Sequence, residues 1–277
     1  MILLLAALQM ALLTAGGQAS AAGPDLSKVE AVGNALFARD RATSLATDRL
    51  VESNGRLPDT LRGWVVLPTN DGWRVVFVQE EGGTYCSRLS VLVDENGAGP
   101  LRQSESCEPL ASDQRAMFLA RQTALSALRT HCSEAYNTVV LPYEGREAAW
   151  AVYLLAATQE AGKVIVGGHV RVLVRQGGLE VVDYQQLSNA CLTLELPSPD
   201  AGKPVALVVT HALDDHPIET HVFLSLLHKV KLYVMTASAM WSVDKGKIRL
   251  LMDGDDFKAY LGRAKLAAGK EKGEGHN

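Results

Sequence analysis

The chain has 277 residues, of which 47% are hydrophobic and 21% charged, and its formal net charge is −4. This composition is typical of globular proteins and excludes collagen-like, coiled-coil and wholly disordered chains. The negative charge argues against a nucleic-acid-binding protein, which usually carries a basic excess, and the length allows one large domain or two small ones.

The first 22 residues predict an export signal. They contain no charged side chain, and only Gln9 interrupts the apolar stretch at residues 2–13. Small residues at 19–21 then supply the pattern that a signal peptidase requires. An uncleaved anchor is the alternative, but a membrane-spanning helix needs about 20 apolar residues. We expect residues 1–21 to be removed, no stable membrane anchor after cleavage, and a periplasmic or extracellular location.

The four cysteines predict two disulfide bonds. None lies in a CxxC pair, so a zinc knuckle or a thioredoxin-like site has no support. An even number of cysteines in an exported chain favours disulfides, although four buried thiols are the alternative. Three connectivities exist for four cysteines. We expect Cys86–Cys107 and Cys132–Cys191, because each pair then falls within one of the two structural units described next.

Two successive segments share one order of elements, a helix followed by short strands. Helical spacing of apolar residues and the absence of proline predict a first helix, and turn residues such as Asn, Asp and Gly separate the strands that follow. The first unit, at 22–110, has a helix at 26–53 and strands at 63–68, 73–78 and 85–93. The second unit, at 111–200, has a helix at 112–131 and strands at 137–142, 149–157, 163–175 and 179–184.

Short sequence matches relate the two units. The segment Val-Val-Leu-Pro occurs at 65–68 and again at 139–142, and Trp73 corresponds to Trp150. We interpret the units as a diverged tandem duplication, with chance similarity between β-rich segments as the alternative. The order of elements over residues 26–184 resembles the cystatin-like and NTF2-like class, in which a curved sheet cradles one helix. The predicted fold class is therefore α+β, with two tandem helix-plus-antiparallel-meander units.

The C-terminal part predicts further strands and a tail. Strands are expected at 205–211, 219–227, 232–237, 239–243 and 247–251. We expect residues 201–257 to complete the sheet of the second unit. The last segment, 258–277, is rich in Gly, Lys and Glu and predicts a disordered tail.

A cluster of histidines and carboxylates at 211–221 is the first candidate site. A hairpin between strands 205–211 and 219–227 would bring His211 and His221 together, with His216 and Asp214 in the connecting loop. Imidazole and carboxylate groups are zinc ligands, so these four residues could bind a divalent metal, or a histidine could act as a general base. The alternative is a polar loop in which the aspartates stabilise the turn. Zinc is the one cofactor that the sequence suggests, and otherwise we expect none.

A second candidate site lies on the predicted strand at 163–175. Alternation along a strand places His169, Arg171 and Arg175 on one face. Such a face could hold a small anionic ligand through charge-assisted hydrogen bonds. The alternative is a one-sided sheet whose outer face is merely polar.

Three sequence motifs of common enzymes are absent: the chain has no G-x-S-x-G, G-x-x-x-x-G-K-[ST] or H-E-x-x-H segment. We therefore expect a non-enzymatic exported protein that binds an unknown protein, a peptide or a small anionic ligand, and no nucleic acid. A secreted metal-dependent hydrolase centred on the histidine cluster is one alternative. The other is an inhibitor or chaperone-like module that pairs an edge strand with a client peptide.

Overall fold

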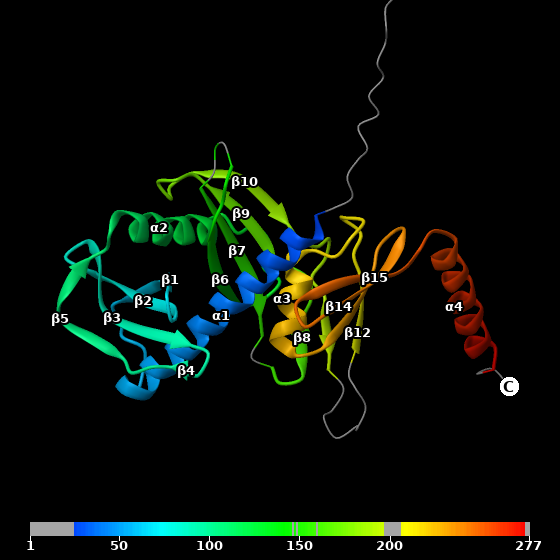
Figure 1. Ribbon diagram of the computed structural model, residues 1–277, viewed down its shortest axis with the longest axis horizontal. Coiled ribbons are helices and arrows are strands. Elements are labelled where there is room, and N and C mark those ends of the chain that lie inside the picture. Colours follow the sequence, from blue (N-terminus) through cyan, green and yellow to red (C-terminus); the bar gives the residue numbers. More distant parts are fainter. Residues whose placement is uncertain (1–24, 146, 148, 159, 197–205, 275–277) are drawn as a thin grey trace, which may run out of the picture.

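The architecture is α+β, as the sequence predicts (Figure 1). The computed structural model describes residues 25–145, 147, 149–158, 160–196 and 206–274, so the predicted signal peptide lies outside the described residues. Within these ranges the chain forms four helices and several sheets whose strands are mainly antiparallel. No helix in the described part is long and apolar enough to cross a membrane.

The first unit consists of helix α1 and one sheet. Its elements are α1 (Leu26–Asn54), β1 (Leu61–Thr69), β2 (Gly72–Glu81), β3 (Thr84–Asp94), β4 (Gly97–Ala98) and β5 (Arg102–Pro109). Helix α1 ends where Gly55 adopts the left-handed conformation, with φ 75°. The sheet has the order β1-β2-β3-β4, and β5 also pairs with β3. Strand β5 was not predicted, because its sequence is polar and almost wholly exposed.

The second unit consists of helix α2 and a four-stranded sheet. Its elements are α2 (Ser112–Ser126), β6 (Ala135–Pro142), β7 (Trp150–Ala157), β9 (Val170–Val174) and β10 (Val181–Gln186), with the sheet order β10-β9-β7-β6. Buried residues of α2 pack against this sheet through Ala120 and Ala124, and against the first sheet through Met117 and Phe118. Helix α2 therefore joins the two sheets.

The predicted continuous strand at 163–175 is wrong. The chain breaks at Gly167–Gly168, and β8 (Lys163–Ile165) pairs with β11 (Thr193–Glu195) in a separate two-stranded sheet. The glycines explain the break. Gly168 has φ +86°, and a Cβ atom on Gly167 would lie 2.1 Å from the Ala190 carbonyl oxygen.

The matching segments of the two units occupy equivalent places in their sheets. In the first sheet Pro68 pairs with Trp73, and in the second Pro142 pairs with Trp150. Two residues before each proline, a valine pairs with a second valine: Val66 pairs with Val75, and Val140 pairs with Val152. The two segments therefore have the same register, and the duplication itself stays a prediction.

The C-terminal segment differs from the prediction. Its elements are β12 (Ala206–Thr210), α3 (Glu219–His228), β13 (Lys231–Met235), β14 (Ala239–Asp244) and β15 (Lys247–Asp253). The predicted strand at 219–227 and its hairpin are wrong: this segment is helix α3, which connects the parallel strands β12 and β13. The four strands form a sheet of their own instead of completing the second sheet.

Helix α3 was predicted as a strand because of its composition. Seven of its residues are buried, on more than one side, so the apolar pattern carries no clear helical period. A connection between neighbouring parallel strands also requires a long crossover, commonly a helix, and the sequence alone did not show that β12 and β13 are parallel.

The C-terminal residues form a helix, α4 (Gly254–Glu274), where the sequence predicted a disordered tail from residue 258. Two acidic residues, Asp255 and Asp256, occupy its first turn, where they interact favourably with the helix dipole. Phe257 is only 3% exposed and packs the start of the helix against the protein. The high Lys and Glu content is compatible with a helix as well as with disorder.

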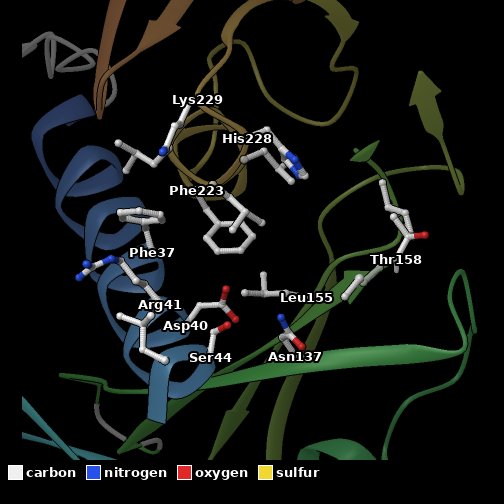
Figure 2. A pocket seen from close by; sticks show the side chains of 17 residues that line it. Phe37, Asp40, Arg41, Ser44, Asn137, Leu155, Thr158, Phe223, His228 and Lys229 are labelled. Atoms are coloured by element: carbon white, nitrogen blue, oxygen red, sulfur yellow. The ribbon is translucent and has the colours of Figure 1, made fainter. Parts of the chain in front are cut away.

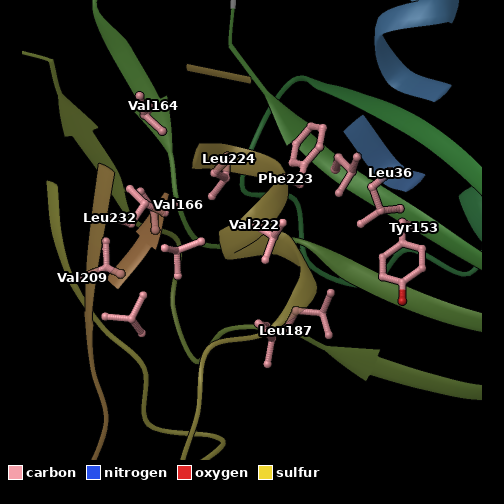
Figure 3. Packing of buried hydrophobic residues seen from close by; sticks show 14 of the residues in the cluster. Leu36, Tyr153, Val164, Val166, Leu187, Val209, Val222, Phe223, Leu224 and Leu232 are labelled. Carbon is pink, nitrogen blue, oxygen red and sulfur yellow. The ribbon is translucent and has the colours of Figure 1, made fainter. Parts of the chain in front are cut away.

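Helix α1 connects two hydrophobic cores. Its second half packs on the first sheet through Ala42, Ala46 and Leu50. Its first half contributes Leu36 to the largest core, together with residues of the second sheet, α3 and the C-terminal sheet. Figure 3 shows Leu36 beside Tyr153, with the side chains of α3 in the middle of this core.

Both expected disulfide bonds are confirmed. Cys86–Cys107 joins β3 to β5, with 5.4 Å between the Cα atoms, and Cys132–Cys191 joins the loop after α2 to the loop before β11, with 5.2 Å. The described part of the chain contains no free cysteine. Paired cysteines fit an exported protein or another oxidising environment.

Candidate ligand-binding site

A cavity of about 490 Å³ lies between α1, α3 and the end of β7. Helix α1 supplies one wall through Phe37, Asp40, Arg41 and Ser44. These residues are spaced i, i+3, i+4 and i+7, so they lie along one face of the helix. Figure 2 shows α1 along one side of the cavity and α3 above it.

The other walls are mainly apolar. Helix α3 is only ten residues long, and its buried face is continuous with the largest core. Beyond its contact with α1, this face of α3 lines the cavity with apolar side chains. The apolar residues from α3 and the strands are Leu155, Ala156, Ala157, Ile165, Phe223, Leu224, Leu226 and Leu227. Cavities of this size with apolar walls and few polar groups are typical of small-molecule sites.

Asp40 is the acidic residue of the cavity. Its side chain is directed into the space close to Ser44 and Asn137 (Figure 2), and the residue is 7% exposed. Burial raises the pKa of Asp40 from 3.8 to about 6, and a hydrogen bond with the Asn137 side chain offsets part of this rise. In the described part of the chain, the carboxyl group forms no ion pair with a basic side chain. A buried carboxylate without a cation is costly.

The basic groups of the cavity are at its edge. Arg41 and Lys229 are exposed, and the guanidinium group of Arg41 is directed away from the space (Figure 2). His228 is half-buried, and burial lowers the pKa of its imidazole, which favours the neutral ring. The charge in the interior is therefore that of Asp40.

The sequence carries a signal for this site in the buried stripe of α1. The buried positions of α1 are Gly33, Leu36, Asp40, Ala42, Thr43, Ala46 and Leu50. Most of them recur at intervals of three or four residues, as on the core-facing side of a helix. Asp40 is the one charged residue in this stripe. An ionisable residue at a core position of a helix is a reason to look for a site.

The structure brings His211 and His221 together, although not through the predicted hairpin. Their rings pack edge to face with centroids 5.0 Å apart, because β12 ends at Thr210 and the first turn of α3 contains His221. The His221 Nδ1 atom accepts a hydrogen bond of 3.0 Å from the Ile218 backbone N–H. Burial lowers the pKa of His221 to about 3, so this imidazole is neutral.

The other predicted metal ligands have protein partners. Nε2 of His211 lies 3.0 Å from Oδ2 of Asp214, and Nδ1 of His216 lies 2.8 Å from the Pro217 carbonyl oxygen. These residues do not belong to any described group of side chains close enough together to hold a metal. The group that meets this condition is Glu81 with Cys86 and Cys107, whose sulfur atoms are joined in a disulfide. The zinc site stays a prediction.

The two arginines of the predicted anion site are paired within the protein, whereas His169 is paired through Nδ1 and its buried Nε2 has no hydrogen-bond partner among the described residues. His169 is fully buried, its Nδ1 accepts a hydrogen bond from the Ala156 N–H, and burial lowers its pKa to about 4. Arg171 pairs with Glu219 at 3.2 Å, and Arg175 pairs with Glu180 at 2.8 Å. An anion would have to compete with the carboxylate partners of Arg171 and Arg175, and the anion site stays a prediction.

Comparison of the chain with protein-family models, with curated proteins and with solved structures gave no match. The feature of the described residues that bears most directly on function is the cavity beside Asp40.

Proposed function

We propose that this protein is a non-enzymatic binding protein of an exported, oxidising location, and that it holds a small amphipathic molecule in the cavity between α1 and α3. The observation that supports this function is the cavity of about 490 Å³ with apolar walls and one buried carboxyl group. Apolar walls supply affinity through the hydrophobic effect, while one polar group orients the ligand.

The disulfides support the location and the rigidity of the protein. The Cys86–Cys107 bond holds the polar edge strand β5 onto the first sheet. The Cys132–Cys191 bond fixes the loops next to β8, whose Ile165 lines the cavity. A site that is largely formed before the ligand arrives loses less conformational entropy on binding.

The proposal includes the predicted tandem architecture. The two helix-plus-meander units would share one origin and would since have diverged. The cavity lies where α1 of the first unit approaches the sheet of the second unit. This arrangement is supported by the equivalent proline–tryptophan pairs, Pro68 with Trp73 and Pro142 with Trp150. It is also supported by the position of Asn137 on β6, next to Asp40 of α1.

The test uses N-phenyl-1-naphthylamine, a neutral probe whose fluorescence rises in apolar surroundings. We expect saturable binding to the mature protein with a Kd of about 10 μM or tighter, which corresponds to about −7 kcal/mol. Ala157→Trp should abolish the signal, since this half-buried residue lines the cavity and the indole would fill it.

The matched control is Leu179→Trp, which adds the same side chain at a position that is 73% exposed and outside the cavity. It should bind the probe like the original protein. Probe binding that Ala157→Trp leaves unchanged, with its circular dichroism spectrum also unchanged, would contradict the proposed site.

A further inference from the structure

We propose that the ligand of this cavity is an amphipathic organic cation, an amine whose ammonium group pairs with the Asp40 carboxylate while its apolar part contacts Phe37 and Phe223. This inference rests on the proposed function and specifies the class of ligand. The geometry supports an amine because the Asp40 carboxyl group is the one charged group in the interior of the cavity, and the walls around it are apolar.

The first step is charge complementarity. Asp40 is 7% exposed and has no basic side chain as a partner among the described residues. A buried ionised group is stabilised when an opposite charge and further hydrogen bonds reach it. Asn137 and Ser44 lie beside the carboxyl group (Figure 2). The Asn137 side chain hydrogen-bonds to the carboxylate, and the Ser44 hydroxyl can accept a further N–H from an ammonium group.

The charged groups that line the cavity with Asp40 come from α1 and from the end of α3. Arg41 belongs to α1, His228 is the last residue of α3, and Lys229 follows it. Among the described residues, no other Lys, Arg, His, Asp or Glu lines the cavity. Arg41 and Lys229 are exposed to water, where their attraction for an anion is weak. The carboxyl group of Asp40 is in the interior, where an ion pair is strong. The site therefore favours a cation over an anion.

The third step is the length of the ligand. Phe37 and Asp40 are three residues apart on α1, a rise of about 4.5 Å along the helix. Phe223 faces the same space from α3 (Figure 2). A ligand with an aromatic or branched apolar group and an amine separated by about four carbon atoms spans this distance. An aromatic ring would also make favourable edge-to-face contacts with either phenylalanine.

The fourth step is pH dependence. An ammonium group pairs with the ionised form of Asp40, and burial raises the pKa of this carboxyl to about 6 in the free protein. Protonation below this pH removes the charge from the site. Affinity for the amine should therefore fall about tenfold between pH 7.5 and pH 5, while a neutral ligand of the same shape should be unaffected.

The experiment measures displacement of N-phenyl-1-naphthylamine by three probes of one size: 4-phenylbutylamine, 4-phenylbutan-1-ol and 4-phenylbutanoate. We expect the amine to bind at least about tenfold more tightly than the other two at pH 7.5. Asp40→Asn should reduce the affinity for the amine to that for the alcohol. Asp48→Asn, an exposed change two turns further along α1, should leave all three affinities unchanged.

The outcomes separate the two proposals. If neither N-phenyl-1-naphthylamine nor any of the three probes binds, the proposed function fails. If 4-phenylbutan-1-ol binds as tightly as 4-phenylbutylamine, or if 4-phenylbutanoate binds most tightly, the cavity is a binding site and the cation proposal is overturned. The pH series on the unmodified protein tests the same point should Asp40→Asn fail to fold: an amine affinity independent of pH between 5 and 7.5 contradicts the role of Asp40.

Discussion

The Tyr153 hydroxyl donates a hydrogen bond of 2.8 Å to Oε1 of Glu219, and this bond joins the second sheet to the first turn of α3. Nη1 of Arg171 donates to the same oxygen at 3.2 Å. Tyr153 and Glu219 are 2% and 7% exposed. Burial, with the nearby carboxylate of Glu219, raises the pKa of Tyr153 above its ordinary value, so the hydroxyl remains a donor. These contacts set the position of α3, and with it one wall of the cavity.

Removing this hydroxyl should weaken the docking of α3. We expect Tyr153→Phe to lower the free energy of unfolding by about 1–3 kcal/mol, because a buried carboxylate loses a donor. Urea unfolding followed by circular dichroism measures the change. Tyr233→Phe is the control, since its hydroxyl makes no hydrogen bond in the described part of the chain. Equal stability of the two variants would show that the bond does not hold α3.

The crossing of α1 and α3 predicts a second sensitive position, Gly33. A Cβ atom there would lie 2.4 Å from the Val222 Cβ and 2.7 Å from the Glu219 carbonyl oxygen. Neither atom can move without shifting α3, so Gly33→Ala should destabilise the protein by about 1–3 kcal/mol despite the better helix propensity of alanine. Thermal unfolding of this variant tests the contact.

Gly262→Ala in α4 is the matched control for this change. A Cβ atom at Gly262 meets nothing within 4 Å, so the same substitution should be neutral or slightly stabilising. If Gly33→Ala is as stable as Gly262→Ala, the two helices are not in close contact at this point.

The sequence predicted most of the first two units, because their helices and strands carry clear periods and turn residues. It missed β5 because that strand is polar and is held by its pairing with β3 and by Cys107. It took α3 for a strand because Val222, Phe223 and Leu224 are buried together and leave no polar face. In both places contacts with distant residues decide the structure, and local patterns do not report them.

The candidate site was harder to predict, because its walls come from three separate parts of the chain. The dense polar clusters at 211–221 and 169–175 stand out in the sequence, and most of their side chains have polar partners within the protein. Asp40 belongs to no cluster, and its distinguishing feature is that a charge stands on the buried stripe of α1. Whether such a residue faces a cavity depends on where α3 lies, which the local sequence of α1 does not determine.

The two disulfides should contribute unequally to stability. The Cys132–Cys191 bond closes a loop with a sequence separation of 59 residues, and Cys86–Cys107 closes one of 21. The chain-entropy estimate gives about 4 and about 3 kcal/mol for these loops. We expect the Cys132→Ser/Cys191→Ser variant to unfold at lower urea than Cys86→Ser/Cys107→Ser, and both at lower urea than the unmodified protein. The reverse order would show that local contacts of β5 outweigh loop entropy.

The ionised Asp40 side chain should make the protein less stable at neutral pH than a variant with an uncharged residue at this position. The pKa of Asp40 is raised from 3.8 to about 6 in the folded chain, so the folded state binds this proton more tightly than the unfolded state. The contribution of Asp40 to the free energy of unfolding is therefore most favourable below about pH 4, where the side chain is protonated, and it is lost as the pH rises to 6. This difference corresponds to about 3 kcal/mol, since each pKa unit is worth about 1.4 kcal/mol.

Asp40→Asn keeps the shape of the side chain but removes its charge at every pH. We expect the variant to exceed the original protein in free energy of unfolding by about 2–3 kcal/mol at pH 8, with the difference shrinking towards zero at pH 4. Urea unfolding at pH 4, 5, 6 and 8 measures it, and Asp48→Asn, an exposed change on α1, should show no such trend. A parallel pH dependence of the Asp40→Asn variant and the original protein would mean that this carboxyl group is not desolvated. A stability gain combined with the loss of amine binding would indicate that the buried charge is retained for the ligand and not for the fold.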